Sequence, residues 1–108
     1  MNSSEYRKLA RRTMNQSLTK REQLTMLALG LGGEAGEVAD LIKKVVFHGH
    51  EMDRDKLIKE SGDVIWYMEN LLDYFDIPMS EVYETNIQKL LSRYPDGFSE
   101  EASRGRKE

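Results

Sequence analysis

Apolar residues recur at every third or fourth position along most of the chain, which is the spacing of an amphipathic α-helix. This spacing predicts four helices, over about residues 4–16, 20–46, 54–75 and 81–93. The second helix has the longest apolar stripe, which consists of Leu24, Leu27, Ala28, Leu31, Val38, Leu41, Ile42 and Val45.

Capping and turn residues set the expected ends of these helices. Ser3 or Ser4 can cap the first helix, Asp53 or Asp55 the third, and Ser80 the fourth. Thr19 and Glu22 have the spacing of a capping box at the start of the second helix. Ile77-Pro78 ends the third helix, because the residue before proline avoids the helical region, and Tyr94-Pro95-Asp96-Gly97 predicts a turn.

Length and composition fit a small all-α protein. The 108 residues are 39% hydrophobic and 32% charged, with only two prolines. We expect one domain, residues 1–108, built as a four- to five-helix, bundle-like protomer that assembles as an oligomer. Its core covers about residues 4–98, and residues 99–108 form a solvated tail.

Charge and cysteine content argue against several classes of partner and binding site. The net charge is −3 and no long basic block occurs, so duplex nucleic acid is not an expected partner. The absence of cysteine excludes disulfides and thiolate metal sites. Residues 1–12 lack the apolar core of a signal peptide, and no apolar run approaches the ~20 residues needed to cross a bilayer. The expected location is cytoplasmic, without a membrane partner.

Each of the two long central helices carries a pair of acidic residues one turn apart. On a helical wheel Glu34 falls inside the apolar sector of the second helix and Glu37 lies at its edge, whereas Asp40 points elsewhere. Glu60 and Asp63 lie on the flank of the third helix, beside its apolar face. If these helices pack together, four carboxylates converge on one small volume.

Clustered carboxylates require a cation or protonation, because like charges held close together repel one another. Ligands that are all oxygen favour a hard cation, Mg²⁺ with Mn²⁺ as a possible substitute. A di-iron bundle would require Glu-x-x-His pairs, and the two histidines, His48 and His50, lie in the predicted connecting segment instead. They are read as solvated, with a role at the edge of a substrate as the alternative.

Mg²⁺ held by a few carboxylates keeps positions open for phosphate oxygens, which points to phosphoryl chemistry. On the fourth helix Asn86, Lys89 and Arg93 recur on one face, where they can hold anionic phosphates or form an ordinary solvated flank. Trp66 and Tyr67 can stack on a base, although packing or a subunit contact is the preferred reading of Trp66.

These residues resemble those of a known family. The chain is similar to the MazG-like branch of the all-α nucleoside triphosphate pyrophosphohydrolases, relatives of the dimeric dUTPases. The resemblance covers about residues 20–98. It rests on 34-EAGE-37, on 60-ESGD-63, and on the downstream segment 86-NIQKLLSRYP-95.

The resemblance implies hydrolysis of a (deoxy)nucleoside triphosphate between its α- and β-phosphates, which gives the monophosphate and pyrophosphate. Nucleotide-pool housecleaning is one role compatible with this reaction. It also implies that Glu34, Glu37, Glu60 and Asp63 hold Mg²⁺ and form the catalytic set, with Glu34 or Glu37 as the base. The protomers are expected to form dimers or tetramers. The residues expected to bind substrate are Lys44, Trp66, Tyr67, Asn70, Asn86, Lys89, Arg93 and Tyr94.

Two alternatives belong to other classes. A non-catalytic helical module for nucleotide sensing or protein interaction would keep the acidic cluster and bind without hydrolysis. A purely structural oligomer would show no effect of Mg²⁺ on its melting temperature.

Overall fold

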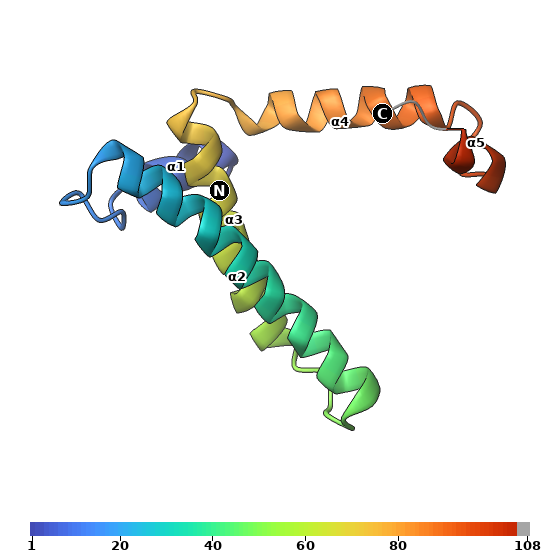
Figure 1. Cartoon of the computed structure of the whole chain (residues 1–108), viewed down its shortest axis with the longest axis horizontal. Helices are drawn as coiled ribbons and strands as arrows, with labels where there is room; N and C mark the ends of the chain where they lie inside the picture. The colour runs from blue at the N-terminus through green and yellow to red at the C-terminus, as the bar shows by residue number, and fades with distance from the viewer. Residues whose placement is uncertain (106–108) are drawn as a thin grey trace. The chain divides into compact units, whose positions relative to one another are not determined.

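The computed structural model describes residues 1–105 and confirms the all-α class (Figure 1). The described residues form five helices and no β-strand, in agreement with the predicted four to five helices. The helices are α1 (Ser3–Arg11), α2 (Lys20–Phe47), α3 (Arg54–Tyr74), α4 (Met79–Arg93) and α5 (Glu100–Arg104).

Helix α1 begins and ends earlier than the sequence predicted. Asn2, rather than Ser3 or Ser4, is the N-cap, and its side chain accepts a hydrogen bond from the backbone of Glu5. The helix ends at Arg11 instead of near Gln16. Two side chains satisfy backbone groups there: the Thr13 hydroxyl donates to the Ala10 carbonyl at 2.7 Å, and Asn15 Oδ1 accepts from the Ser17 amide at 3.0 Å. Such local bonds compete with helix continuation.

The two central helices follow the sequence prediction closely. Thr19 and Glu22 form the expected capping box at the start of α2. Of the two predicted caps for α3, Asp53 is the one used, and it accepts from Lys56. The chain reverses between the helices, where Gly49 has a φ of 70° that a residue with a side chain rarely adopts.

The start of α4 and the region after it differ from the prediction. Pro78 is the N-cap and no side chain caps this end, so Ser80 lies inside the helix. A proline is tolerated at a helix start because the first backbone amides have no partner within the helix. The predicted turn is confirmed, since the amide of Gly97 donates to the Tyr94 carbonyl at 3.1 Å. The expected tail contains α5, capped by Ser99, and residues 106–108 lie outside the described residues.

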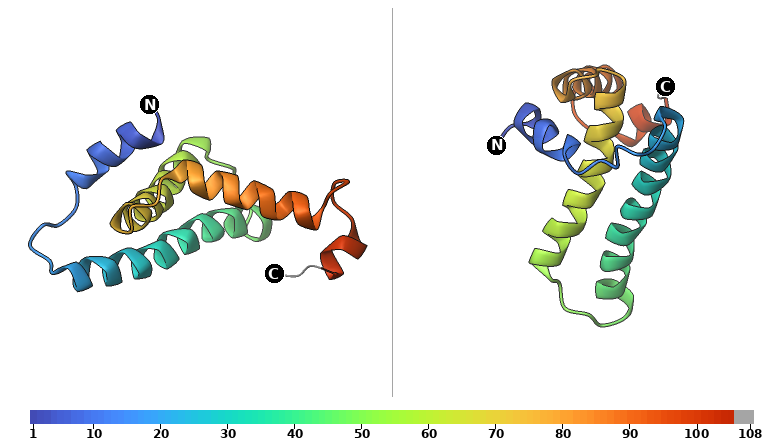
Figure 2. Two further views of the ribbon diagram at one scale, coloured as in Figure 1. Left: turned by 90° about the horizontal axis from the view of Figure 1, so that it is seen from above. Right: turned by 90° about the vertical axis from the view of Figure 1, so that its left-hand side faces the viewer.

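The chain divides into two compact units, residues 1–76 and the part from Ile77 onward. In the first unit α2 and α3 lie side by side and antiparallel, and α1 packs against α3 (Figure 2). The second unit contains α4 and α5. The single-domain assignment stays a prediction, because two compact units can still belong to one domain.

The core of the first unit is small. Leu27 is fully buried, and Leu41 and Ala10 are nearly so. Large apolar side chains on the outer surfaces of α2 and α3 stay exposed, among them Leu29 at 73% and Phe47 at 78%. No helix in the described part of the chain has an apolar run long enough to span a membrane.

Candidate functional site

Three of the four predicted carboxylates come together between α2 and α3. Glu34 on α2 and Glu60 and Asp63 on α3 each place an oxygen within 4.8 Å of the others. Glu34 and Glu60 are half-buried, whereas Asp63 is exposed. We call this group the acidic cluster.

Packing at Gly30 fixes the register that brings these carboxylates together. The Tyr67 ring of α3 lies so close to the Gly30 backbone that a Cβ there would overlap it. Because the helices are antiparallel, one turn forward on α2 and one turn back on α3 bring Glu34 opposite Asp63. A Cβ at Gly32, Gly33 or Gly36 would meet no described atom within 4 Å, so the close approach in the glycine-rich stretch is at Gly30.

The acidic cluster holds unbalanced negative charge. The pKa of Glu34 is raised above its ordinary value, first by partial burial and then by the negative charges of Asp63, Glu60 and Glu37 in that order. No basic side chain forms an ion pair with a cluster member within the described residues. The cluster therefore favours a proton or a cation.

Glu37 does not lie in this group of three, although the sequence placed it with the others. It is exposed on α2, and its charge raises the pKa of Glu34 less than the charges of Asp63 and Glu60 do. The physical reason is its place at the edge of the helix face, one turn beyond Glu34. Its role as a ligand or base stays a prediction.

Asp40 lies away from the acidic cluster, as the helical wheel predicted. It pairs with two lysines of its own helix, at 3.2 Å from Lys43 Nζ and 2.9 Å from Lys44 Nζ. The pKa of Asp40 is lowered by its hydrogen bonds to Lys44 and Lys43. Lys44, a predicted substrate ligand, is thus held by Asp40 in this structure.

The aromatic and amide residues after Asp63 have definite packing roles. Trp66 Nε1 donates to the Thr13 hydroxyl at 2.7 Å, which agrees with the preferred reading of Trp66 as a packing residue. The rings of Trp66 and Tyr67 meet edge to face at 4.9 Å. Asn70 is only 6% exposed, and its Nδ2 donates to the Trp66 carbonyl at 2.9 Å.

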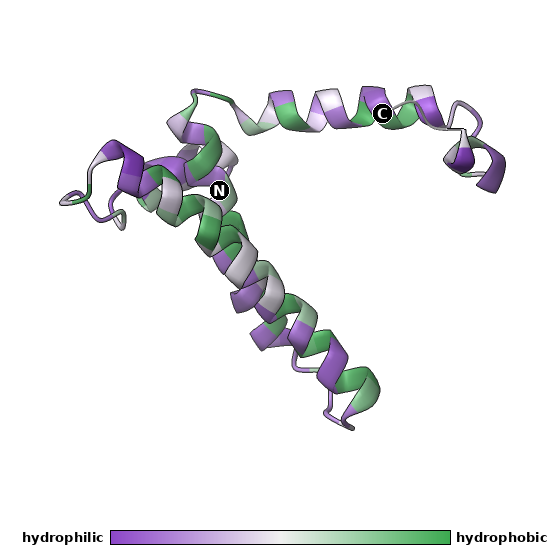
Figure 3. Ribbon diagram, in the orientation of Figure 1, coloured by the Kyte–Doolittle hydropathy of each residue, from purple (hydrophilic) through white to green (hydrophobic). Residues whose placement is uncertain are grey.

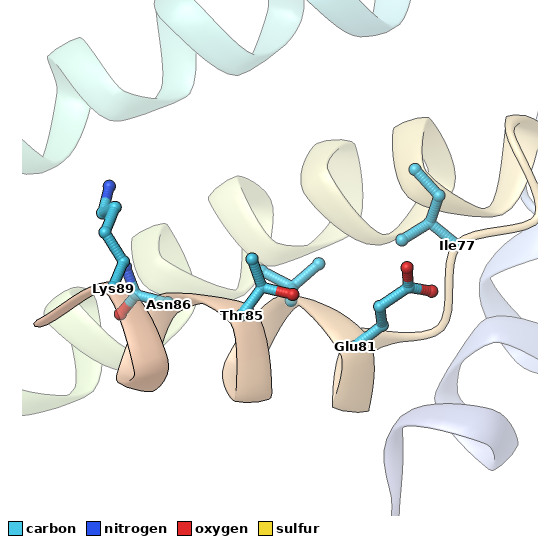
Figure 4. Close-up of a pocket in the computed structure, with 6 residues that line it drawn as sticks. Ile77, Glu81, Thr85, Asn86 and Lys89 are labelled. Carbon is cyan, nitrogen blue, oxygen red and sulfur yellow. The ribbon is translucent and has the colours of Figure 1, made fainter. Parts of the chain in front are cut away.

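In the second unit, two of the predicted phosphate ligands line one pocket. Asn86 and Lys89 contribute to a pocket of about 330 Å³ on α4 (Figure 4). Its other lining residues are Ile77, Glu81, Val82 and Thr85.

Arg93 and Tyr94 follow at the end of α4. The Arg93 guanidinium lies 5.8 Å from the centre of the Tyr94 ring, and Arg93 Nε is buried without a hydrogen-bond partner. The Tyr94 ring in turn lies 5.5 Å from that of Phe98. The structure thus brings Asn86 and Lys89 to one pocket and leaves Arg93 and Tyr94 in a separate aromatic contact.

Comparison with known proteins identifies the family of the chain. The model of the MazG nucleotide pyrophosphohydrolase domain matches residues 22–98. The chain belongs to the MazG family. Gene 37 protein of Mycobacterium phage L5 is 39% identical over 80 residues, which cover 70% of each chain. No solved structure matches the chain.

Helix α1 lies outside the part matched by the MazG model, yet it contacts α3 through polar residues that sequence reasoning missed. Arg7 Nε donates to Glu69 at 2.8 Å in a buried pair, and Arg11 donates twice to Asp73 at 2.6 Å. The signal was available: each helix carries two of these charges four residues apart, which puts them on one face.

Tyr6 of α1 is a further residue that the sequence did not single out, and it lies close enough to Asp63 of the acidic cluster to feel its charge. Its pKa is raised, first by burial and then by the charges of Glu69 and Asp63. In the sequence Tyr6 was one apolar position of an amphipathic helix, and nothing in the pattern placed it beside α3.

Proposed function

We propose that this MazG-family protein hydrolyses a (deoxy)nucleoside triphosphate between the α- and β-phosphates and releases the monophosphate and pyrophosphate. The observation that carries the proposal is the convergence of Glu34, Glu60 and Asp63 from two helices to within 4.8 Å. Family membership supports the reaction class, since the matched domain is a nucleotide pyrophosphohydrolase.

The acidic cluster fits a divalent cation. Its donors are carboxylate oxygens, which suit Mg²⁺ or Mn²⁺. The raised pKa of Glu34 marks uncompensated negative charge that a cation would relieve. Glu34, Glu60 and Asp63 would hold Mg²⁺, and when bound it supplies charge that neutralises phosphate oxygens and acidifies water.

We assign the proton of the attacking water to Glu37. Of the two carboxylates on α2 that were expected to act as base, Glu37 lies outside the group of three and is exposed. A carboxylate at this position can accept a proton while the other three hold the cation.

Basic and aromatic residues would bind the rest of the substrate. Lys44 would exchange Asp40 for the leaving pyrophosphate, since an exposed lysine exchanges ionic partners at little cost. On α4 Asn86, Lys89 and Arg93 offer donors for phosphate oxygens. The aromatic and amide contacts with sugar and base are assigned to Trp66, Tyr67 and Asn70 of the first unit.

We also propose that the protein is a homo-oligomer. Apolar side chains on the outer surfaces of α2 and α3 are exposed, including Leu29 at 73%, Val46 at 65% and Ile58 at 52%. Figure 3 shows the apolar end of α2 next to the connecting segment. Covering such side chains with a second copy removes apolar area from water. Light scattering after size-exclusion chromatography gives the mass; a monomer at micromolar concentration would contradict the proposal.

The test of the reaction is a panel of ribo- and deoxynucleoside triphosphates incubated with purified protein and Mg²⁺, with all phosphate products resolved. We expect pyrophosphate and a nucleoside monophosphate from at least one substrate. Glu60→Gln and Asp63→Asn should each lower kcat/KM by about 100-fold or more, as when a transition-state contact is removed.

Asp55→Asn is the matched control, because Asp55 lies on the same helix but outside the acidic cluster. It should leave turnover unchanged. Release of the γ-phosphate alone, or no turnover of any triphosphate by folded protein, would overturn the proposed reaction.

A further inference from the structure

Charge is distributed unevenly along this acidic chain. Residues 1–21 contain six basic residues and one acidic residue, whereas residues 22–108 contain ten basic and eighteen acidic residues. The net charge of −3 therefore combines a positive N-terminal segment with a negative remainder. Such a segment attracts anions even though the whole molecule is negative.

The first unit gathers the charges of this segment at one end. Arg11 of α1 donates to Asp73 near the end of α3 at 2.6 Å. A cavity is lined from all three helices, by residues that include Arg11, Gln23 of α2 and Tyr74 of α3. Figure 2 shows α1, the start of α2 and the end of α3 at the same end of this unit. Basic residues from both helices therefore lie at one end of the fold.

Most of these basic side chains have no partner in the fold. Two arginines of α1 pair with carboxylates of α3. The remaining basic side chains of residues 1–21 are exposed and form no ion pair within the described residues; they are Lys8, Arg12, Lys20 and Arg21. We call these four the basic patch. Glu22 and Asp76 are the acidic neighbours at this end, and two negative charges do not balance four positive ones.

Two members of the basic patch lie where a helix disfavours a cation. Lys20 and Arg21 are the first two residues of α2. A helix N-terminus carries partial positive charge, so anions are favourable there and cations are not. Lys8 and Arg12, by contrast, lie at the end of α1, where the helix dipole favours a cation. Lys20 and Arg21 thus strengthen the positive potential at this end without a gain in helix stability.

Two exposed aromatic rings lie at the same end of the unit, where α3 ends. Tyr74 and Phe75 are 36% and 56% exposed, and their ring centres are 5.1 Å apart. Tyr74 lines the same cavity as Arg11. Basic side chains beside exposed rings are the combination that binds single-stranded nucleic acid, because phosphates meet the charges and unpaired bases stack on the rings.

We propose that the basic patch and the rings of Tyr74 and Phe75 bind single-stranded nucleic acid. A duplex keeps its bases stacked inside and offers them no face, in line with the expectation that duplex nucleic acid is not a partner. An acidic protein surface would use the charges but not the ring faces. An anionic membrane is bound by a helix with a free apolar face, whereas α1 packs against α3.

Fluorescence anisotropy of a labelled oligothymidylate of about 15 nucleotides tests the proposal. EDTA in the buffer excludes metal and hydrolysis. Four contacts between basic side chains and phosphates predict a salt slope of about −2.8, since each contributes about −0.7 on a single strand. The affinity should therefore fall about 50-fold between about 50 and about 200 mM salt. A duplex of the same length should bind at least about 5-fold more weakly, because its bases cannot stack on the rings.

Variants separate the charges from the rings. The double variant Lys20→Gln with Arg21→Gln should halve the salt slope and leave the turnover of triphosphates unchanged. Phe75→Leu should weaken binding by at least about 5-fold, the loss of one stacked base, and should keep the salt slope. Lys56→Gln with Lys59→Gln removes two exposed lysines of α3 and is the matched control, which should bind as the wild type does. Circular dichroism verifies that each variant is folded.

No binding of the single strand by folded protein, or equal binding of single strand and duplex, would overturn the proposal. So would an unchanged affinity of the Lys20→Gln, Arg21→Gln variant. Binding to vesicles of phosphatidylcholine and phosphatidylserine in equal parts, without binding of the single strand, would assign the basic patch to a membrane surface instead. Loss of triphosphate turnover in the double variant would assign Lys20 and Arg21 to that substrate and overturn their separate role.

Discussion

Helix α3 carries two sets of carboxylates, which differ in the charge of the side chains that face them. Near its end Glu69 and Asp73 face Arg7 and Arg11 of α1. In its first half Glu60 and Asp63 face a third carboxylate on α2. Where carboxylates serve the fold, the chain supplies the cation itself. The acidic cluster lacks such a partner among the described residues, so its negative charge is not balanced by the described part of the chain.

The pKa values of one carboxylate near each set shift in opposite directions, in agreement with this contrast. The hydrogen bond from Arg11 lowers the pKa of Asp73, and the Arg11 and Arg7 charges act in the same direction. Burial and three neighbouring carboxylates raise the pKa of Glu34. The two directions therefore distinguish a carboxylate that is paired with arginine from a carboxylate that has only negative neighbours.

The largest expected effect on stability comes from breaking the buried ion pair of Arg7 and Glu69, which we call the structural pair. Arg7→Met leaves Glu69 buried without its partner, since the two side chains are only 10% and 5% exposed. Loss of one member of a buried pair costs about 3–5 kcal/mol, to be measured as the free energy of unfolding in urea. The double variant with Glu69→Leu should recover most of this. A loss below about 1 kcal/mol for Arg7→Met would contradict the comparison.

Mg²⁺ should stabilise the protein by binding to the acidic cluster, and the structural pair should not contribute to this effect. At 100 times its Kd, Mg²⁺ should stabilise the wild-type protein by about 2.7 kcal/mol, seen as a higher Tm. Glu34→Gln should raise the Tm without Mg²⁺, because repulsion is relieved, and should lose most of the Mg²⁺ response. Glu84→Gln on α4 is the control and should keep the full response. A wild-type Tm that does not change with Mg²⁺ would contradict the distinction between the acidic cluster and the structural pair.

The contact between Gly30 and the Tyr67 ring, which lies between the two sets of carboxylates, can also be tested. Gly30→Ala forces the Tyr67 ring to move, because the added Cβ would overlap it. Such overpacking typically costs about 1–3 kcal/mol. Gly36→Ala meets no described atom and should instead stabilise α2 by up to about 1 kcal/mol. Equal effects of the two variants on urea unfolding would contradict the register described for α2 and α3.

The smallest expected effects are the pH dependences, which have opposite signs. Asp73 has a lowered pKa, so its contribution to stability is present above its ordinary value of 3.8 and is lost as pH falls through the folded-state pKa. Glu34 has a raised pKa, so its contribution is present below 4.5 and is lost as pH rises through the folded-state pKa.

Melting curves from pH 2 to 7 without Mg²⁺ provide the measurement. Asp73→Asn should flatten the acid limb, and Glu34→Gln should raise the Tm on the neutral side. Identical pH profiles for the two variants would show that the two sets of carboxylates do not differ.

Periodicity and capping predicted the central helices well because both signals are local. The Thr19 and Asp53 caps, together with the apolar stripes, set the bounds of α2 and α3. The helical wheel also put Glu34 on the packing face, which brings it to Glu60 and Asp63. The caps, stripes and helix faces depend on residues within a few turns of one another, whereas the approach of Glu34 to Glu60 and Asp63 also requires that α2 and α3 pack together.

Features that depend on distant partners were not predicted. Arg7 and Glu69 each read as part of a polar face, and only the packing of α1 on α3 makes them a buried pair. The early end of α1 depends on side-chain hydrogen bonds from Thr13 and Asn15 that compete with the helix. The position of Glu37 outside the group of three was not predicted, because a helical wheel places residues on faces and does not resolve single turns.

The contacts of α1 also affect the order in which the protein folds. The Ser3–Glu69 and Arg7–Glu69 bonds join residues 66 and 62 positions apart, whereas α2 and α3 are joined by a short reversal. Closing a long loop costs more entropy, so the α2–α3 hairpin should form before α1 docks. Trp66 fluorescence, sensitive to the bond with Thr13, should then recover after far-UV ellipticity. By this argument α1, which precedes α2 and α3 in the sequence, should be the last part of this unit to reach its native contacts.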